Sequence, residues 1–270
     1  MIRLADPDLH DNDIDACVRV LRSGRLVHGE ICVAFEKELA AFLEAKHVCL
    51  VSSGTAALYC ALLTHGVGPG DAVLVSDFTF PASFNAVERL GARPVPVDVD
   101  PKSYNMNPDA LLKTLLAWSY DEKPRAVMPV HQFGMAADMG AIGHVAKTHS
   151  LAVIHDAACA LGARFGERRL GSEGTVCFSF HPRKSLTTGD GGAVALDDDA
   201  LAERLSLFRN HGMQLYDTGI RFIEAGLNFR LTDFQAALGR GQLKRLEERL
   251  SRCVALARRY FEALAAFPVG

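Results

Sequence analysis

The sequence lacks any apolar run long enough to cross a bilayer. The segment HVCLVSSGTAALYCALLTHG is interrupted by Ser52, Ser53, Gly54 and Thr55, whereas a membrane-spanning helix needs about 20 consecutive, mainly apolar residues. The first residues, MIRLADPDLHDNDID, are acidic and do not have the basic-then-apolar order of a signal peptide. We therefore expect a soluble protein without a membrane partner.

Basic residues are not in excess, since 29 Lys and Arg stand against 32 Asp and Glu. Nucleic-acid binding depends on clustered positive charge, so no nucleic-acid partner is expected. The seven cysteines form no CxxC pair, so no metal site is expected, and most lie inside apolar segments, as buried free thiols do. An odd number of cysteines without metal spacing favours the reducing cytoplasm.

Short β-rich runs alternate with helical patterns along most of the chain. The predicted strands cover residues 48–53, 71–76, 92–100, 125–131, 151–157, 175–180 and 191–198. The predicted helices between and after them cover residues 54–66, 81–91, 109–118, 136–150 and 200–212, and Asn107 with Pro108 forms a cap-and-first-turn signal for the third of these. This alternation predicts an α/β fold with a mostly parallel sheet and helices on both faces. Such sheets bind ligands at the carboxyl ends of their strands.

Several loops at these strand ends carry chemical groups. The turn SSGTAAL leads from a strand directly into a helix, so the amides near Gly54, Thr55 and Ala56 are free to bind an anion such as phosphate. A Ser or Thr helix cap without a ligand explains this turn equally well.

Two further strand ends have two interpretations each. Asp156 ends an apolar strand, where it either caps the next helix or pairs with a buried cation. Phe78 and Phe80 follow another strand, where they either pack in the core or cover a flat heterocycle.

Lys184 lies in the loop CFSFHPRKSLTTGDGG, among small residues. Taken alone, a lysine in such a loop is most often a solvated surface charge. Together with an anion cradle, an aromatic plate and a strand-end carboxylate, it completes the set that holds pyridoxal phosphate (PLP). Lysine forms the Schiff base, and the carboxylate keeps the pyridine nitrogen protonated.

The sequence resembles the DegT/DnrJ/EryC1/StrS aminotransferases over residues 20–245, approximately. The matching segments are LRSGRLVHGEICVAFEKELAAFL, SSGTAAL, TFPASFNAV, GARPVPVDVDPKSYNMNP, PVHQFGMAADM, HDAACALGA, SFHPRKSLTTGDGG, FRNHGM and GLNFRLTDFQAALGRGQL. The resemblance implies the large domain of a fold type I PLP-dependent transferase. It also implies amino transfer to a nucleotide-linked keto sugar, with glutamate as the expected donor.

The resemblance assigns roles to individual residues. Lys184 and Asp156 are the catalytic pair, which bind the aldehyde carbon and the pyridine nitrogen of the cofactor, and Phe80 stacks on its ring. Asn228 reaches the phosphate of the neighbouring subunit's cofactor, which implies a homodimer with shared sites. The cofactor-binding residues as a set are Gly54, Thr55, Ala56, Phe80, Asp156, Cys159, Ser179, Lys184 and Asn228.

Four positions depart from the family pattern. Cys159 stands where most relatives have glutamine or histidine near the phenolic oxygen of the cofactor, and a thiol is a weak donor. His155 replaces a common glutamate, Asp190 another glutamate and Ala137 a frequent proline. None of these changes removes a group that the chemistry requires.

Some residues of the matching segments have a structural alternative. His131 and Asp138 are more readily interpreted as residues that hold a strand-to-helix turn. His181, His211 and Arg230 are candidates for substrate contact, with packing or interface ion pairs as alternatives. Two functions other than transamination also stay open, a PLP-dependent sugar dehydratase and a non-catalytic PLP-binding regulator.

The pattern changes past Arg230, where residues 234–267 predict one long charged helix. We therefore expect a PLP-binding large domain with an N-terminal segment over residues 1–245, followed at 246–270 by the start of a small domain that is largely missing. Leu256, Tyr260, Phe261, Leu264 and Phe267 recur at helical spacing. This apolar face is expected to lie against the large domain or to remain exposed.

Overall fold

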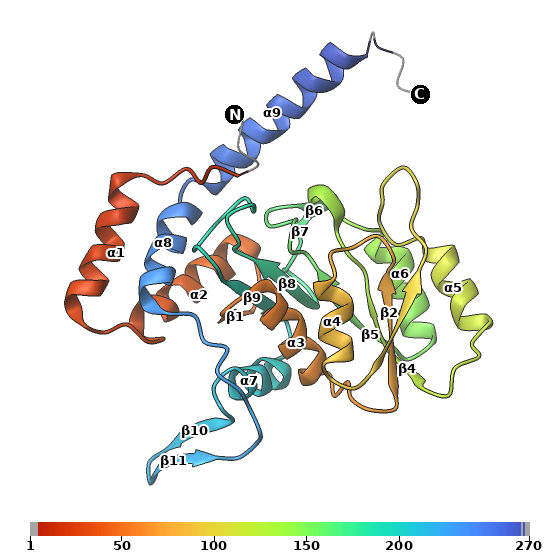
Figure 1. Cartoon of the computed structure of the whole chain (residues 1–270), viewed down its shortest axis with the longest axis horizontal. Coiled ribbons are helices and arrows are strands. Elements are labelled where there is room, and N and C mark those ends of the chain that lie inside the picture. The colour runs from red at the N-terminus through yellow and green to blue at the C-terminus, as the bar shows by residue number, and fades with distance from the viewer. Residues whose placement is uncertain (1–4, 266, 268–270) are drawn as a thin grey trace.

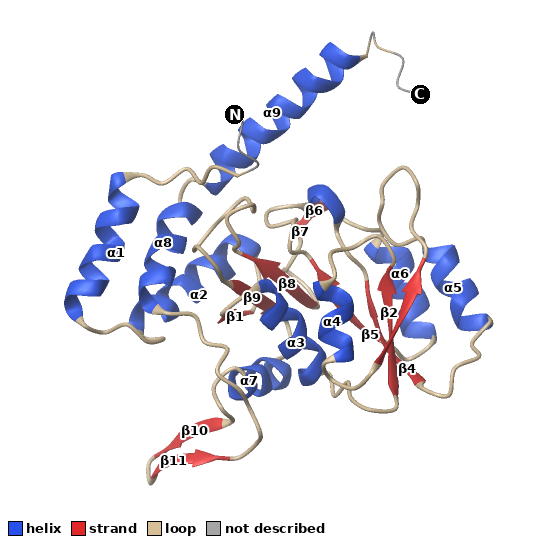
Figure 2. Cartoon of the chain, viewed as in Figure 1, coloured by secondary structure: helices blue, strands red, loops and turns tan. Residues whose placement is uncertain are grey.

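A seven-stranded sheet forms the centre of the chain, which we describe from a computed structural model for residues 5–265 and 267 (Figures 1 and 2). The strand order is β1-β9-β8-β5-β4-β2-β3. The strands span His47–Val51 (β1), Asp71–Ser76 (β2), Arg93–Val97 (β3), Lys123–Met128 (β4), Ala152–Asp156 (β5), Thr175–Ser179 (β8) and Gly192–Leu196 (β9). Each predicted strand is present; β2 has the predicted bounds, and the ends of the others are shifted by a few residues.

In the central sheet, β9 runs antiparallel to both of its neighbouring strands. It pairs antiparallel with both β1 and β8, while β3, β2, β4, β5 and β8 pair in parallel. The expected mostly parallel sheet is therefore confirmed, with one reversed strand. The carboxyl ends of the parallel strands meet at one edge, where the predicted site residues are.

Helices cover both faces of the sheet, because side chains alternate between the two faces along each strand. Cys49 and Val51 of β1 join the core under α3 (Gly54–Thr64), α4 (Ala82–Glu88) and α7 (Asp199–Phe208). Val48 and Leu50 join the opposite core with α2 (Glu30–Leu43) and α8 (Asp233–Leu243). A third core lies under α5 (Pro108–Leu116) and α6 (Met139–Thr148).

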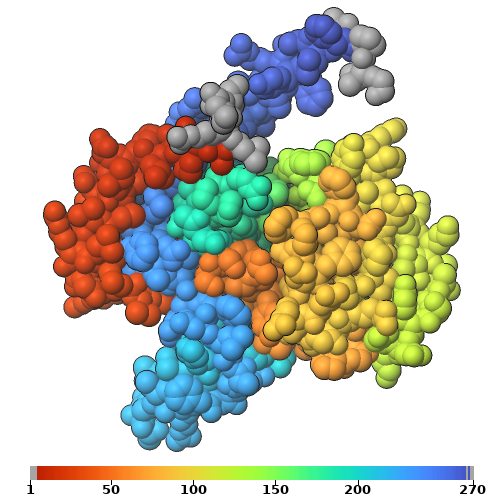
Figure 3. Space-filling model, in the orientation of Figure 1, coloured from red at the N-terminus to blue at the C-terminus, as the bar shows by residue number. Residues whose placement is uncertain are grey.

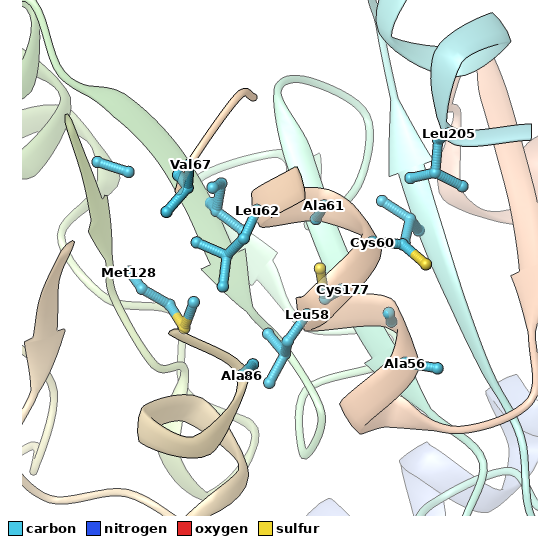
Figure 4. Close-up of a cluster of buried hydrophobic side chains, with 14 of the residues drawn as sticks. Ala56, Leu58, Cys60, Ala61, Leu62, Val67, Ala86, Met128, Cys177 and Leu205 are labelled. Atoms are coloured by element: carbon cyan, nitrogen blue, oxygen red, sulfur yellow. The ribbon is translucent and has the colours of Figure 1, made fainter. Parts of the chain in front are cut away.

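Helix α3 is apolar on almost all sides and lies in the middle of the first core (Figure 4). Cys60 of this helix and Cys177 of β8 are buried there. Burial raises the pKa of the Cys60 thiol to about 12 and that of Cys177 well above its usual range. Such thiols stay protonated. Cys32, Cys49, Cys60 and Cys177 are buried, as predicted for most of the cysteines, whereas Cys159 and Cys253 are exposed.

Helix caps follow the sequence signals. The side chain of Asn107 accepts hydrogen bonds from the amides of Asp109 and Ala110, with Pro108 in the first turn of α5. Asp138 caps α6 by accepting from the amide of Ala141 at 2.9 Å. Asp138 therefore holds the turn, as its structural interpretation predicted.

The predicted long helix over residues 234–267 is two helices, α8 and α9 (Leu246–Leu264). The chain bends at Arg245, whose guanidinium donates to Asp13 of α1 (Asp11–Ser23) at 2.6 Å. Helix α8 packs beside α1, whereas α9 projects from the body (Figures 1 and 3). Tyr260 and Phe261 of its apolar face, and Phe267 just beyond its end, are 65–78% exposed, so this face is largely open to solvent.

Two hairpins were not expected from the sequence. One joins β6 (Arg164–Phe165) to β7 (Arg168–Arg169), and the other joins β10 (Met213–Tyr216) to β11 (Gly219–Phe222). The β10–β11 hairpin protrudes from the body and exposes Leu215 and Phe222 to 79% and 71% (Figures 1 and 3). Across the described residues, helices long and apolar enough to span a membrane are absent.

Candidate active site

Asp156 ends β5 with its side chain buried, at 5% exposure. Its carboxylate accepts hydrogen bonds from the Ser83 hydroxyl at 2.8 Å and from the Ala158 amide at 3.1 Å. Burial raises the pKa of this carboxyl, and the two hydrogen bonds and the charge of Lys184 oppose that rise. A buried carboxylate of this kind is a partner for a positive charge.

Lys184 lies in the loop after β8, and its amide closes a turn on the carbonyl of His181 at 2.8 Å. Its Nζ donates a hydrogen bond to Sγ of Cys159 at 3.0 Å. Cys159 follows Asp156 in the next loop, so the lysine and the carboxylate lie at the same edge of the sheet. The weak thiol acceptor leaves the amine able to exchange partners.

The start of α3 carries the segment that is predicted to bind an anion. Ser53 caps the helix by accepting from the amide of Ala56 at 3.0 Å, so this amide is already engaged. The first amides of a helix have no acceptor within it, which leaves those of Gly54 and Thr55 for an anion. The Thr55 side chain is exposed at the same place.

Gly54 lies directly against Ser179 at the end of β8. A methyl group added at Gly54 would be 2.7 Å from Cβ of Ser179 and 3.0 Å from its Oγ. This contact joins the two predicted phosphate-binding segments, so the glycine is required by space rather than by backbone angle.

Replacing Gly54 by alanine should lower the free energy of unfolding by about 1–3 kcal/mol, because the added methyl overpacks against Ser179. The separation of the two cradle segments should also weaken cofactor binding. Gly68→Ala is the matched control, since no atom lies within 4 Å of the added methyl there. Urea unfolding and a PLP titration of both variants check this, and equal behaviour of the two would show that the contact is unimportant.

The other predicted residues lie around this edge. Phe80 is 69% exposed in the loop between β2 and α4, three residues before Ser83. Asn228 is exposed and forms an isolated bridge with Asn210, and the next carbonyl, of Phe229, accepts from the Ser52 amide at 2.7 Å. The Asn228 segment is therefore tied to the strand that leads into the cradle.

A pair of buried histidines lies behind the site. His131 accepts from the Ala137 amide at Nδ1, so its Nε2 carries the proton and donates to Nδ1 of His155 at 3.1 Å. The His131 amide donates to the carbonyl of Asp156 at 2.9 Å. His131 therefore holds the turn, as expected, and also fixes the strand that carries Asp156.

The histidine pair should make the protein less stable in mild acid. Burial lowers the pKa of His155 from 6.5 to about 4, so the unfolded chain binds the proton first as the pH falls through 6.5. His155 alone should reduce the free energy of unfolding by about 2 kcal/mol between pH 7 and pH 5. Urea unfolding at both pH values measures the total loss. His155→Gln should reduce it by the His155 share, while the share of His131, whose pKa burial also lowers, should remain. An unchanged pH dependence in that variant would contradict the assignment.

Sequence reasoning did not identify two contacts of the site. Ser83 is fully buried and orients Asp156, although it lies within the quoted segment TFPASFNAV. The contact between Lys184 and Cys159 joins two segments that are distant in sequence. For the contact between Ser83 and Asp156, the signal in the sequence was a small polar residue shortly after the end of a predicted strand.

A large cavity lies elsewhere in the chain. Its volume is about 1000 Å³, and it lies between α1, the following loop and α8, with Arg19, Arg25 and Lys244 in its lining. None of the predicted cofactor residues lines it. The predicted cofactor residues thus lie at the sheet edge and not in the cavity at α1.

The groups at the sheet edge fit PLP. A glycine-lined cradle with free amides suits its phosphate, a buried carboxylate suits its pyridine nitrogen, and a lysine suits its aldehyde. Within the described parts of the chain, no group of three His, Cys, Asp or Glu side chains is arranged to hold a metal ion. The fold and the site define a PLP-dependent aminotransferase of fold type I.

The chain belongs to the DegT/DnrJ/EryC1/StrS aminotransferase family, whose model matches residues 7–270. It is 42% identical to the erythromycin biosynthesis sensory transduction protein EryC1 of Saccharopolyspora erythraea, over 95% of this chain and 69% of that protein. It is 40% identical to GDP-perosamine synthase of Caulobacter vibrioides, over 93% of this chain and 66% of that enzyme.

Among solved structures, DesV of S. venezuelae in complex with a ketimine intermediate superposes with a TM-score of 0.89. It is 41% identical, and the match covers 95% of this chain and 67% of DesV. The chain therefore spans about two thirds of the length of these relatives. The predictions of family, fold class, enzyme class and cofactor are confirmed, whereas the roles of individual residues stay predictions.

Proposed function

We propose that this protein uses PLP to transfer an amino group from an amino acid to a nucleotide-linked keto sugar, in the biosynthesis of amino sugars for cell-surface polysaccharides or natural products. The observation that carries the proposal is the approach of Lys184 and the buried Asp156 to one sheet edge, beside the Gly54 cradle. The relatives named GDP-perosamine synthase and DesV support the substrate class.

Bound PLP supplies an aldehyde that takes up an amino group and a ring that stores an electron pair. The residues of the chain do the rest. The amides of Gly54 and Thr55, with Ser179, hold the phosphate, and the carboxylate of Asp156 keeps a proton on the ring nitrogen. Lys184 Nζ, once free as an amine, would take a proton from the substrate carbon and deliver it to the former aldehyde carbon of the cofactor.

We further propose that the protein is a homodimer in the cytoplasm. Asn228 is exposed in a single chain, and the nearby β10–β11 hairpin presents Leu215 and Phe222 to solvent. A second copy of the chain would cover these groups, and Asn228 of one subunit would then lie at the phosphate cradle of the other. The boundary of the cofactor domain is proposed near residue 245, where α9 leaves the body.

Glutamate is the proposed donor, and an absorbance experiment tests both steps. The yellow holoprotein should lose its colour with glutamate and regain it with a nucleotide-linked keto sugar. A dehydratase would leave no new amino group on the sugar, and a non-catalytic regulator would keep its colour. A panel of uridine, thymidine and guanosine diphosphate keto sugars then identifies the acceptor, and no turnover with any of them would overturn the proposed substrate class.

A further inference from the structure

Three aromatic side chains contact one another at the carboxyl edge of the sheet, and we call them the aromatic cluster: Phe78, Tyr104 and Phe133. Their ring centroids are 5.1 Å (Phe78–Tyr104), 6.2 Å (Phe78–Phe133) and 6.0 Å (Tyr104–Phe133) apart. They come from the loops that follow β2, β3 and β4. All three are exposed, and Phe133 reaches 72%. Rings of this size normally lie in the core, so an exposed group of three indicates a ligand surface.

Hydrogen bonds hold the three loops in one arrangement. Gln132 donates from Nε2 to the carbonyl of Phe78 at 2.7 Å, and its amide donates to Oδ1 of Asn105 at 2.8 Å. Asn105 in turn donates to the carbonyl of Met135 at 3.2 Å. Gln132 and Asn105 are both buried, so these connections are shielded from water.

The backbone of the cluster is strained where its rings project. Tyr104 and Phe133 have φ values of 58° and 54°, a left-handed conformation that bulky residues rarely adopt. Such strain persists only where the surrounding structure enforces it, and it is concentrated at functional sites. The backbone that carries the rings is therefore held in one arrangement before a ligand arrives, which reduces the entropy lost on binding.

The cluster borders the site of Lys184. A methyl group added at Gly134, next to Phe133, would lie 3.6 Å from the carbonyl oxygen of Cys159. Cys159 is the residue whose sulfur accepts the hydrogen bond from Lys184. On the other side of Phe133, the amide of His131 donates to the carbonyl of Asp156. A ligand with its reacting end at Lys184 can thus extend over the aromatic cluster.

We propose that the aromatic cluster is the subsite for the base of the nucleotide-linked sugar, with Phe133 as the ring on which the base stacks. This inference rests on the proposed function. Of the three parts of such a substrate, the sugar is needed at Lys184 and the diphosphate carries charge. Only the base presents a flat, uncharged π surface, which aromatic rings bind regardless of which base it is.

The test measures by calorimetry how tightly uridine, thymidine and guanosine diphosphates bind to the holoprotein. Phe133→Leu removes the ring but keeps an apolar side chain, and it should weaken binding of the preferred diphosphate about tenfold or more. Phe133→Tyr keeps the ring and should bind as the unchanged protein does. Phe261→Leu on α9 is the matched control, because Phe261 is 78% exposed and lies away from the site.

The outcomes separate this inference from the proposed function. If Phe133→Leu binds the preferred diphosphate normally, the subsite is wrong while the transaminase activity stands. If Phe133→Leu instead changes the oligomeric state in light scattering, the cluster is a subunit interface and the inference is overturned. If the unchanged protein reacts with glutamate but binds none of the diphosphates, the subsite and the nucleotide-linked substrate class both fail.

Discussion

Lys184→Ala should lower the rate of amino transfer from glutamate by about 10²–10⁴-fold or more, because it removes the group that moves the proton. The variant should still fold, since the Lys184 side chain is only partly buried and its Nζ donates a hydrogen bond to the thiol of Cys159, a weak acceptor. Stopped-flow absorbance of the half-reaction with glutamate measures the loss. Lys184→Arg keeps the positive charge without the nucleophilic amine and should be equally inactive.

Borohydride reduction of the holoprotein gives a second measurement of the same assignment. The reduced cofactor should be found by peptide mapping on Lys184, and no label should form in Lys184→Ala. Lys147 lies on α6 away from the cradle, so Lys147→Ala should retain both label and activity. A label on Lys147 or on Lys102 would show that Lys184 is only a surface charge.

Asp156→Asn should reduce amino transfer by about 10²–10³-fold, because a preorganised charge opposite the pyridine nitrogen is lost. The amide has the same shape and can still accept hydrogen bonds from Ser83 and Ala158. Normal turnover with glutamate in this variant would show that Asp156 has only a structural role.

Stability measurements can distinguish the effect of the negative charge of Asp156 from the effect of the shape of its side chain. Burial raises its pKa in the fold above the unfolded value, so its favourable contribution is present below an ordinary aspartate pKa. That contribution is lost as the pH rises through the pKa of the folded state. Without cofactor, Asp156→Asn should therefore be at least as stable as the unchanged protein at pH 7 in urea unfolding. A clearly less stable variant would mean that the carboxylate itself stabilises the empty fold.

The central sheet could be predicted because its strands are short, apolar and bounded by clear turns. DAVLVS, for example, became β2 over the same residues, since both of its faces are covered. The break between α8 and α9 was not predictable from periodicity. It depends on Arg245 and Asp13, which lie at opposite ends of the sequence and meet only in the fold.

The chemistry of the site was predictable only in part, for a similar reason. Lys184, Asp156 and Gly54 lie in segments whose local pattern indicates a strand end or a helix start. Ser83 and the pair His131–His155 act through contacts between loops, and no local pattern describes such contacts. The exposed β10–β11 hairpin was missed because its sequence, MQLYDTGIRF, has few β-branched residues and no buried face.

The position of β9 determines when the cofactor site can form during folding. Among the described residues, the one strand that pairs with β1 in the central sheet is β9, so His47 gains its partner Leu196 only when β9 joins the sheet. Pairing between such distant segments is slow, because a long loop must close before any contact compensates for the lost entropy. The cradle after β1 and the lysine before β9 therefore come together late. Tight PLP binding is therefore expected only once β9 has paired with β1 and β8.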